Sequence, residues 1–515
     1  MSPVNQDIRF NRLQVINTAL SSEKDLNKLL ELIVNGAQEL THADGATLYI
    51  LDNKNEYLHF KIVANTTLKI WMGASHSQIT WPPLPMKIGK YPNLASVSTA
   101  AATIGEVIDV ADVYKCNRFD FTGTKEFDSR TGYKSQSMIV VPLKDHLDNV
   151  IGVLQLLNAL DDNNKVIAFN KEDKKLIEAM ASQAAVAINN TQLVADLKNF
   201  LYSFISSISN AIDVKSAFQT GHVRRVTKIA CMIAKKISNI KTGPFKTYKF
   251  NQQQLEEIRI AGQLHDIGKI ITPDHILCKA TKLETILDGA ETINLRFEIL
   301  KRDREIAALK KALGKNIIVD VSDIEENQNF VMNANTGSEF MSKEDQAKID
   351  QIAKIPCTIN NKTQPLLAQW ECENLKIAKG TLNNQERQII QDHVVHSIEM
   401  LEELPFPKDL CHVPEIAGSH HEKLDGSGYP KGKSKKDLSL AARIMAVADI
   451  FEALTAKDRP YKQPMSLNQA LKIMGLMIKD NHIDGNIFEC FINEGVMKQY
   501  CQEELSPEQI KDYQW

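Results

Sequence analysis

The strongest constraint on the fold is a long stretch, from Lys171 to Val214, that contains neither glycine nor proline. Apolar residues return along it at steps of three and four residues, the spacing of one face of an α-helix. These residues are Leu176, Ile177, Met180, Ala184, Ala187, Ile188, Leu193, Leu197, Phe200, Leu201, Phe204, Ile205, Ile208 and Ile212. We therefore expect a long connecting helix between two folded regions.

The apolar stripe of this helix has two interpretations. A seam of this length favours a parallel two-helix coiled coil, which would make the protein a homodimer and couple its two regions. The alternative is that the stripe packs on the domains of its own chain.

Length and charge narrow the class of protein. The 515 residues exceed the ~250–300 residues at which single cores stop growing, so we expect at least two domains. A net charge of -3 gives no general attraction to nucleic acid or to anionic membranes. No apolar run approaches the ~18–20 residues of a membrane span, and the first twelve residues lack the apolar core of a signal peptide. The eight scattered cysteines indicate reduced thiols and a cytoplasmic protein.

The region before the connecting helix has a mixed α/β pattern. Helical spacing extends from Val15 to Leu40, and strand-like runs follow at 46–51, 58–63, 138–143 and 150–158. The last two runs are separated by six residues with the composition of a hairpin loop. We expect an antiparallel sheet covered by helices on one side, with a ligand-sized pocket over its other face.

This region resembles a GAF domain, a small-molecule sensor module. The residues that carry the resemblance are 43–49, 127–133, 139–143 and 151–156, and the resemblance covers about 24–192, followed by a connecting signalling helix at 193–215. The order of Asn117, Phe127 and Asp128 is similar to the NKFDE-type pattern of GAF domains that bind cyclic nucleotides. It implies a cyclic nucleotide or another small molecule as ligand, whereas the alternative is that Asn117 and Asp128 are loop-capping residues.

After residue 215, potential metal ligands recur in helical surroundings. His265 and Asp266 stand side by side in an apolar run, where an aspartate can bridge two cations while the histidine holds one. Gly268 ends that helix, and Lys269 follows where an anion near the metals would meet it. Asp449 lies in a strongly apolar helix, where a carboxylate is costly to bury without a cation or donor. The remaining candidates are His222, His393, His420 and His421.

Five histidines and two aspartates form a ligand set of nitrogen and oxygen only. The absence of thiolates disfavours a structural zinc or iron–sulfur site and suits Fe, Mn, Co, Ni or Zn at an open catalytic site. Two divalent ions, two carboxylates and a hydroxide would leave a charge of about +1, which favours a phosphate substrate. A dinuclear centre can also lower the pKa of a bound water towards ~7.

The same residues resemble the motifs of the HD-GYP family of metal-dependent phosphohydrolases. The match consists of 220–222, the HDIGK stretch at 265–269, the HHEKLDGSGYP stretch at 420–430, Asp449 and the RPYK stretch at 459–462. It implies an all-α domain over 216–515 that hydrolyses cyclic di-GMP to linear pGpG, and further to GMP. Two other interpretations stay open: a catalytically silent sensor or scaffold with a structural metal site, or a hydrolase of another cyclic dinucleotide.

Carried over residue by residue, the resemblance assigns the site. Asp266 would bridge two divalent ions, Fe or Mn first and Zn, Co or Ni as alternatives. One ion would also be held by His222, His265 and Asp449, and the other by His393, His420 and His421. Lys269, Arg459 and Lys462 would bind substrate phosphate, with Asp266 and Lys269 as the catalytic pair. The GYP loop at 425–430 would shape the substrate entrance or contact a partner protein, and its glycines allow unusual backbone angles.

Two departures from the family pattern stand out. Some family members bind a third metal through a glutamate one helical turn before the residue that matches His222, and this chain has Phe218 there. The interval from His265 to His393 covers 393 − 265 = 128 residues, against a few tens in the family, so we expect an insertion at about 284–377. Amphipathic helices are expected over 286–313 and 343–354. The insertion is either a lid, dimer contact or partner surface, or a tolerated helical hairpin on the domain's edge.

Overall fold

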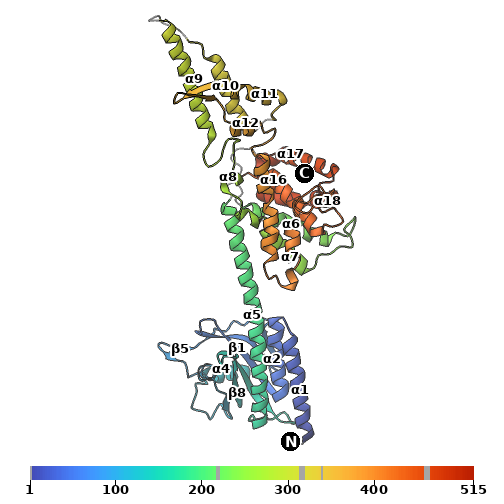
Figure 1. Ribbon diagram of the computed structural model, residues 1–515. Coiled ribbons are helices and arrows are strands. Elements are labelled where there is room, and N and C mark those ends of the chain that lie inside the picture. The colour runs from blue at the N-terminus through green and yellow to red at the C-terminus, as the bar shows by residue number, and fades with distance from the viewer. Residues whose placement is uncertain (1–2, 216–220, 313–318, 338–339, 458–463) are drawn as a thin grey trace. The chain divides into compact units, whose positions relative to one another are not determined.

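The computed structural model describes residues 3–215, 221–312, 319–337, 340–457 and 464–515. The chain forms two compact units, Met1–Leu201 and Tyr202–Trp515. The expected fold class is confirmed: an α/β unit, a long helix and a helical region follow one another (Figure 1). No helix in the described ranges is both long and apolar enough to cross a bilayer.

The first unit is built on an antiparallel sheet with the strand order β3-β2-β1-β9-β8-β7, to which β4 and β10 add short pairings. Its main strands are β1 (Ala43–Leu51), β2 (Tyr57–Asn65), β8 (Met138–Lys144) and β9 (Val150–Leu160). The shorter strands are β3 (Ile70–Gly73), β4 (Leu84–Pro85), β7 (Ile108–Val110) and β10 (Val166–Ile167), and β5 (Lys87–Ile88) pairs with β6 (Tyr91–Pro92).

Alternation along the strands fills one core on each face of this sheet, because successive strand residues point to opposite sides. Leu48 and Leu154 share one core with residues of α1 (Pro3–Ser22), α2 (Leu26–Thr41) and the first part of α5 (Lys171–Lys215). These three helices lie side by side against the sheet (Figure 1). Tyr49 and Val153 face the other core, which includes α3 (Val97–Ile104); α4 (Thr122–Thr131) follows later in the chain. The helix expected from Val15 to Leu40 is wrong as one element, since Asp25 caps α2 by accepting a hydrogen bond from the Lys28 backbone N–H.

The second unit contains the helices that carry the candidate ligands. They are α6 (His222–Asn239), α7 (Gln252–Leu264), the 3₁₀ turn η1 (Ile267–Ile270), α14 (His393–Glu402), α15 (Val413–Ala417) and α16 (Leu440–Thr455). The remaining elements around them are α8 (Asp274–Leu277), α13 (Asn384–Gln391), η2 (Lys408–Leu410), α17 (Leu467–Lys479), α18 (Gly485–Asn493), α19 (Val496–Glu504) and α20 (Pro507–Ile510). Helices α6 and α16 contact each other, and Ile229 on α6 and Val447 on α16 are fully buried.

The segment from Leu283 to Leu375, where the sequence predicts an insertion, has a hydrophobic core of its own. It comprises α9 (Gly289–Ala312), α10 (Ser322–Asn335), α11 (Lys343–Ala353), the hairpin β11 (Pro356–Ile359) to β12 (Lys362–Pro365), and α12 (Gln369–Leu375). Ile293, Phe297, Val331 and Ile349 are fully buried in its core. Both expected helices exist, but α10, α12 and the hairpin go beyond the simple helical hairpin that the sequence suggested.

Candidate metal centre

Six of the seven predicted metal ligands lie at or near helix ends, and Asp449 lies inside a helix. His222 is the first residue of α6, and His393 is the first residue of α14. His265 and Asp266 form the junction between α7 and η1, and His420 and His421 follow α15. All seven side chains are buried except that of His421, which is half-buried. The structure therefore gathers residues from five separate segments into one place.

Asp266 lies between two groups of imidazoles. Its Oδ2 is 3.4 Å from His222 Nε2 and 3.3 Å from His265 Nε2. Its Oδ1 is 3.2 Å from His393 Nε2 and 4.0 Å from His420 Nε2. Two ligands on one ion lie roughly 3 Å apart when each is about 2.1 Å from it at a right angle. The spacing thus suits a carboxylate that gives one oxygen to each of two ions.

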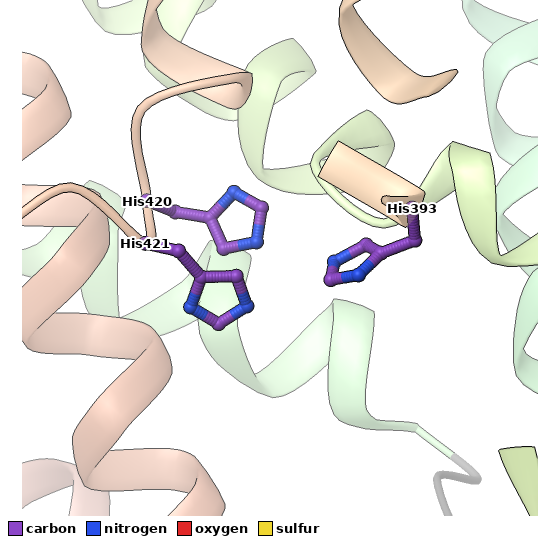
Figure 2. Close-up of side chains that lie close together, drawn as sticks. All are labelled: His393, His420 and His421. Carbon is purple, nitrogen blue, oxygen red and sulfur yellow. The ribbon is translucent and has the colours of Figure 1, made fainter. Parts of the chain in front are cut away.

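Each group of imidazoles has further members. Asp449 Oδ1 is 3.4 Å from His222 Nε2 and 4.0 Å from His265 Nε2, which completes the first group. In the second group, His393 faces His420 and His421 from the opposite side (Figure 2). Within each group of three, one ligand atom from every residue lies within 4.8 Å of the others. The result is two adjacent groups of three candidate ligands each.

Local backbone geometry turns the imidazoles towards the centre. The Nδ1 atoms of His265 and His420 lie 2.8 Å from Gly262 O and 2.6 Å from Ala417 O, and His393 Nδ1 makes the same contact with Ile390 O. Since a carbonyl oxygen only accepts, each Nδ1 carries the proton and each Nε2 presents a lone pair. In all three cases the carbonyl belongs to the residue three positions before the histidine.

Whether a metal fits can be judged from three imidazole nitrogens, the Nε2 atoms of His265, His393 and His420. All three are buried and have no hydrogen-bond partner among the described residues. An unsatisfied buried polar atom costs about 1–3 kcal/mol, and three of them converge on one carboxylate here. A divalent cation would satisfy all of them, so the donor set fits the metal chemistry expected from the sequence.

His222 is oriented by a carboxylate instead of a carbonyl. Its Nδ1 donates to Glu452 Oε2, and Arg225 Nε donates to Glu452 Oε1 over 2.6 Å. Glu452 is 1% exposed and lies one turn after Asp449 on α16. This is the carboxylate–histidine arrangement that fixes ligand orientation in metal sites. Sequence reasoning missed Glu452 and Arg225, although a glutamate in so apolar a helix was a usable signal.

The charges of the site favour a bound cation. Burial opposes ionisation of Asp266, yet the Lys269 ammonium and neighbouring imidazoles hold its pKa well below the usual range. Burial would lower the pKa of His222, but Asp266, Asp449 and Glu452 raise it well above its ordinary value. This excess of negative charge around one imidazole is what a metal ion would neutralise.

In the second group, the pKa values of two imidazoles are lowered instead of raised. Burial lowers the pKa of His421 to about 4, and burial together with His421 brings the pKa of His420 well below its ordinary value. Both rings are neutral at pH 7, and neutral imidazole is the form that binds metal.

The predicted phosphate-binding residues are only partly described. Lys269 on η1 places its Nζ 2.7 Å from Asp266 Oδ2, at the edge of the centre. Arg459 and Lys462 lie outside the described residues, as does Phe218.

The GYP loop is anchored beside the second group of imidazoles. The Tyr429 ring lies 4.8 Å from the His421 ring, centroid to centroid. Buried Glu422 accepts hydrogen bonds from the backbone N–H groups of Lys431, over 2.8 Å, and Lys433, over 2.9 Å. A Cβ at Gly428 would lie 2.4 Å from the Lys423 backbone nitrogen, so the loop can close here only on glycine.

The three candidate GAF ligand residues differ in burial and in contacts. Asn117 is exposed, and half-buried Phe127 lies edge-on to Trp81. Asp128 is buried and accepts hydrogen bonds from Tyr114 Oη over 2.7 Å and from the Ser135 backbone N–H over 2.8 Å. These contacts are those of a loop-capping carboxylate.

Family models match both units of the chain. The GAF domain model matches 25–188, and two HD domain models match 220–355 and 370–487. An HD domain implies divalent metal binding, and the groups of histidine and aspartate described above are the residues that could provide it.

Named relatives match parts of the chain. The 3′3′-cGAMP-specific phosphodiesterase 1 of Vibrio cholerae is 39% identical over 123 residues, 24% of this chain and 27% of the relative. The 3′3′-cGAMP-specific phosphodiesterase 2 of the same organism is 22% identical over 64% of this chain and 42% of its own length. The cyclic di-GMP phosphodiesterase of Thermotoga maritima is 35% identical over 19% of this chain and 27% of its own length. The chain thus matches well under two thirds of each relative.

Among solved structures, the GAF domain of the Acinetobacter phosphoenolpyruvate-protein phosphotransferase aligns with 38% of this chain and 99% of its own. The TM-score is 0.28 and the identity 17%.

Proposed function

We propose that this chain, which combines a GAF domain with an HD domain, is a metal-dependent phosphodiesterase that hydrolyses cyclic di-GMP to linear pGpG and onward to GMP. The observation that carries the proposal is the pair of imidazole groups on either side of Asp266, with three buried Nε2 atoms directed inward. Relatives named cyclic di-GMP phosphodiesterases support the choice of substrate.

Seven side chains would hold two divalent ions. His222, His265, Asp449 and Asp266 Oδ2 would bind the first, and His393, His420, His421 and Asp266 Oδ1 the second. The all-nitrogen-and-oxygen set suits Fe or Mn, with Zn, Co and Ni as alternatives. When bound, two such ions supply an acidified water and neutralise phosphate charge.

The protein's own groups would position the substrate. Lys269 places an ammonium next to Asp266, where it can meet a phosphate oxygen of the substrate. We assign the same role to Arg459 and Lys462 on the sequence motif alone. Asp266 would hold the two halves of the site in register by binding both ions. Because Lys269 would contact the substrate phosphate beside it, Asp266 and Lys269 are the proposed catalytic pair.

The substrate has one specific rival. Relatives that are 39% and 43% identical over their matched segments are named as 3′3′-cGAMP-specific phosphodiesterases. Both compounds are cyclic dinucleotides with two phosphodiester bonds, so the same centre could cleave either.

The N-terminal GAF region would regulate this activity. We assign residues 24–192 to a sensor of a cyclic nucleotide or other small molecule, 193–215 to a signalling helix and 216–515 to the phosphohydrolase, with an insertion at about 284–377. Helix α5 runs unbroken from Lys171 to Lys215, which supports mechanical coupling. Leu193 and Leu197 on α5 are 55% and 69% exposed, which supports a homodimer formed through this helix. The GYP loop is a proposed protein contact, and the eight free cysteines favour the reducing cytoplasm.

The test is hydrolysis of each dinucleotide by the purified full chain. The apo-protein is loaded anaerobically with Fe²⁺ or Mn²⁺, and products are separated by ion exchange and identified by mass. We expect linear pGpG, and then GMP, from cyclic di-GMP. If 3′3′-cGAMP is cleaved at least tenfold faster than cyclic di-GMP, then 3′3′-cGAMP is the substrate instead. A metal-loaded protein that cleaves neither compound would be a silent sensor.

A further inference from the structure

One buried hydroxyl links the two halves of the candidate centre. Ser397 on α14 is fully buried, and its Oγ donates to His265 O over 3.0 Å and accepts from the Gly268 backbone N–H over 2.9 Å. The two backbone partners flank Asp266 on either side. Ser397 itself is one helical turn after His393, which belongs to the other group of imidazoles.

The backbones of η1 and α14 are in direct contact where Ser397 joins them, and this contact is called the seam below. A Cβ at Gly268 would lie 2.0 Å from His393 O and 2.6 Å from the Ser397 backbone nitrogen. Only a hydrogen fits there, so the lack of a side chain at Gly268 sets how closely η1 approaches α14. The reason for glycine is this close approach.

The seam fixes one distance of the proposed metal centre. Asp266 Oδ1 and His393 Nε2 are 3.2 Å apart and belong to the two elements that Ser397 joins. The turn at His265 and Asp266, called the HD turn below, carries two ligands of the first proposed ion and shares Asp266 with the second, whereas α14 carries His393 for the second. Any slip of α14 along η1 would therefore change the second site and leave the first almost intact.

We propose that Ser397 is a positioning residue that, with Gly268, holds His393 in register with Asp266 so that the second metal ion can bind. This role rests on the proposed two-metal site. Replacing Ser397 by alanine removes a hydroxyl that satisfies a buried N–H and a buried carbonyl at once, and the segments are then free to separate. Supporting groups around metal ligands typically contribute about 10–100-fold in metal affinity.

The experiment is a Mn²⁺ titration of the full apo-protein, followed by calorimetry and electron paramagnetic resonance. Two Mn²⁺ ions that share a carboxylate give a spin-coupled signal, whereas a lone ion gives an isolated six-line signal. We compare wild type with Ser397→Ala and Gly268→Ala. Ser238→Ala is the matched control, because its Oγ also donates to a carbonyl, Ala234 O, and accepts a distant backbone N–H, that of Phe250.

We expect both seam variants to keep one site and to lose at least tenfold in affinity for the second ion, with an isolated Mn²⁺ signal, while Ser238→Ala behaves as wild type. Circular dichroism checks folding, and if Gly268→Ala does not fold, Ser397→Ala decides alone, since it only removes an atom. Wild-type affinities and a coupled signal in Ser397→Ala would overturn the positioning role. If wild type itself bound no coupled pair, the two-metal site would be wrong, whereas a coupled pair without hydrolysis would overturn only the proposed activity.

Discussion

Asp266 is the residue whose loss should affect the centre most, because each of its oxygens faces a different group of imidazoles. Replacing Asp266 by alanine removes a ligand from both proposed ions at once. We expect the Asp266→Ala variant to lose both metals and to show no detectable hydrolysis, by elemental analysis and product assay. Normal turnover of cyclic di-GMP by this variant would show that the site is wrongly assigned.

Glu452 offers a milder test at the same scale. Replacing it by glutamine keeps the size of the side chain but removes the charge that orients His222 and pairs with Arg225. We expect Glu452→Gln to weaken metal binding by about 10–100-fold, measured by competition with a chelator. An unchanged affinity would mean that the carboxylate serves the fold alone.

Single residues also show how far sequence reasoning reaches. The seven candidate ligands could be selected from the family motifs that the sequence resembles, and the structure brings them close together. Glu452, Arg225 and Ser397 could not be assigned, since their roles depend on neighbours more than a hundred residues away in the chain. Asp128 shows the reverse case, in which a motif residue makes the contacts of a loop cap.

At the scale of elements, the predicted insertion packs around a hydrophobic core of its own. Helices α9 and α11 were predictable from the spacing of their apolar residues, whereas the β11–β12 hairpin was not, since its strands are only four residues long. The break between α1 and α2 was missed because helical spacing continues across the cap at Asp25.

Fully buried Phe297 provides a test of that separate core. We expect Phe297→Ala to destabilise the insertion by about 3–5 kcal/mol, the usual cost of deleting a buried phenylalanine ring. Hydrogen exchange should then accelerate in α9 to α12, while metal content stays that of wild type. Equal acceleration in α6 and α16 would show that the insertion has no independent core.

Helices α6 and α19 are joined by an ion-pair cluster with a defined pH dependence. Hydrogen bonding to Arg224 lowers the pKa of Glu504 from 4.5 to about 2, and Lys228 lies 2.6 Å from the same carboxylate. A depressed pKa adds stability that is complete above pH 4.5 and is lost as the pH falls towards 2.

We therefore expect Glu504→Gln to lower the free energy of unfolding by about 1 kcal/mol at pH 7, with the deficit vanishing towards pH 2. Urea unfolding across this pH range measures it. Glu494→Gln is the control, because its pair with Lys236 is more exposed and should contribute less. A deficit that persists unchanged at pH 2 would contradict the ionic origin.

At the scale of the whole molecule, α5 is the element that belongs to both units. The sequence predicted it from the absence of glycine and proline, and the helix extends from Lys171 to Lys215. At its end, Lys215 Nζ donates to the carbonyl of Thr272 over 2.9 Å, just after the HD turn. We propose that this contact transmits movement of the helix to the segment that carries His265 and Asp266.

The proposed homodimer depends on the exposed apolar residues of α5. We expect the double variant Leu193→Asp, Leu197→Asp to be monomeric in light scattering after size exclusion, because charges at a coiled-coil seam oppose pairing. Exposed Asn199, on another face of α5, provides the control Asn199→Asp, which should stay dimeric. A wild-type protein that is monomeric at high concentration would contradict the dimer.

The most direct test of the central claim is anomalous X-ray diffraction from crystals of the full chain loaded with Mn²⁺. We predict two anomalous peaks on either side of Asp266, one within bonding distance of His222, His265 and Asp449, and the other of His393, His420 and His421. A single peak, or two peaks that Asp266 does not bridge, would contradict the account.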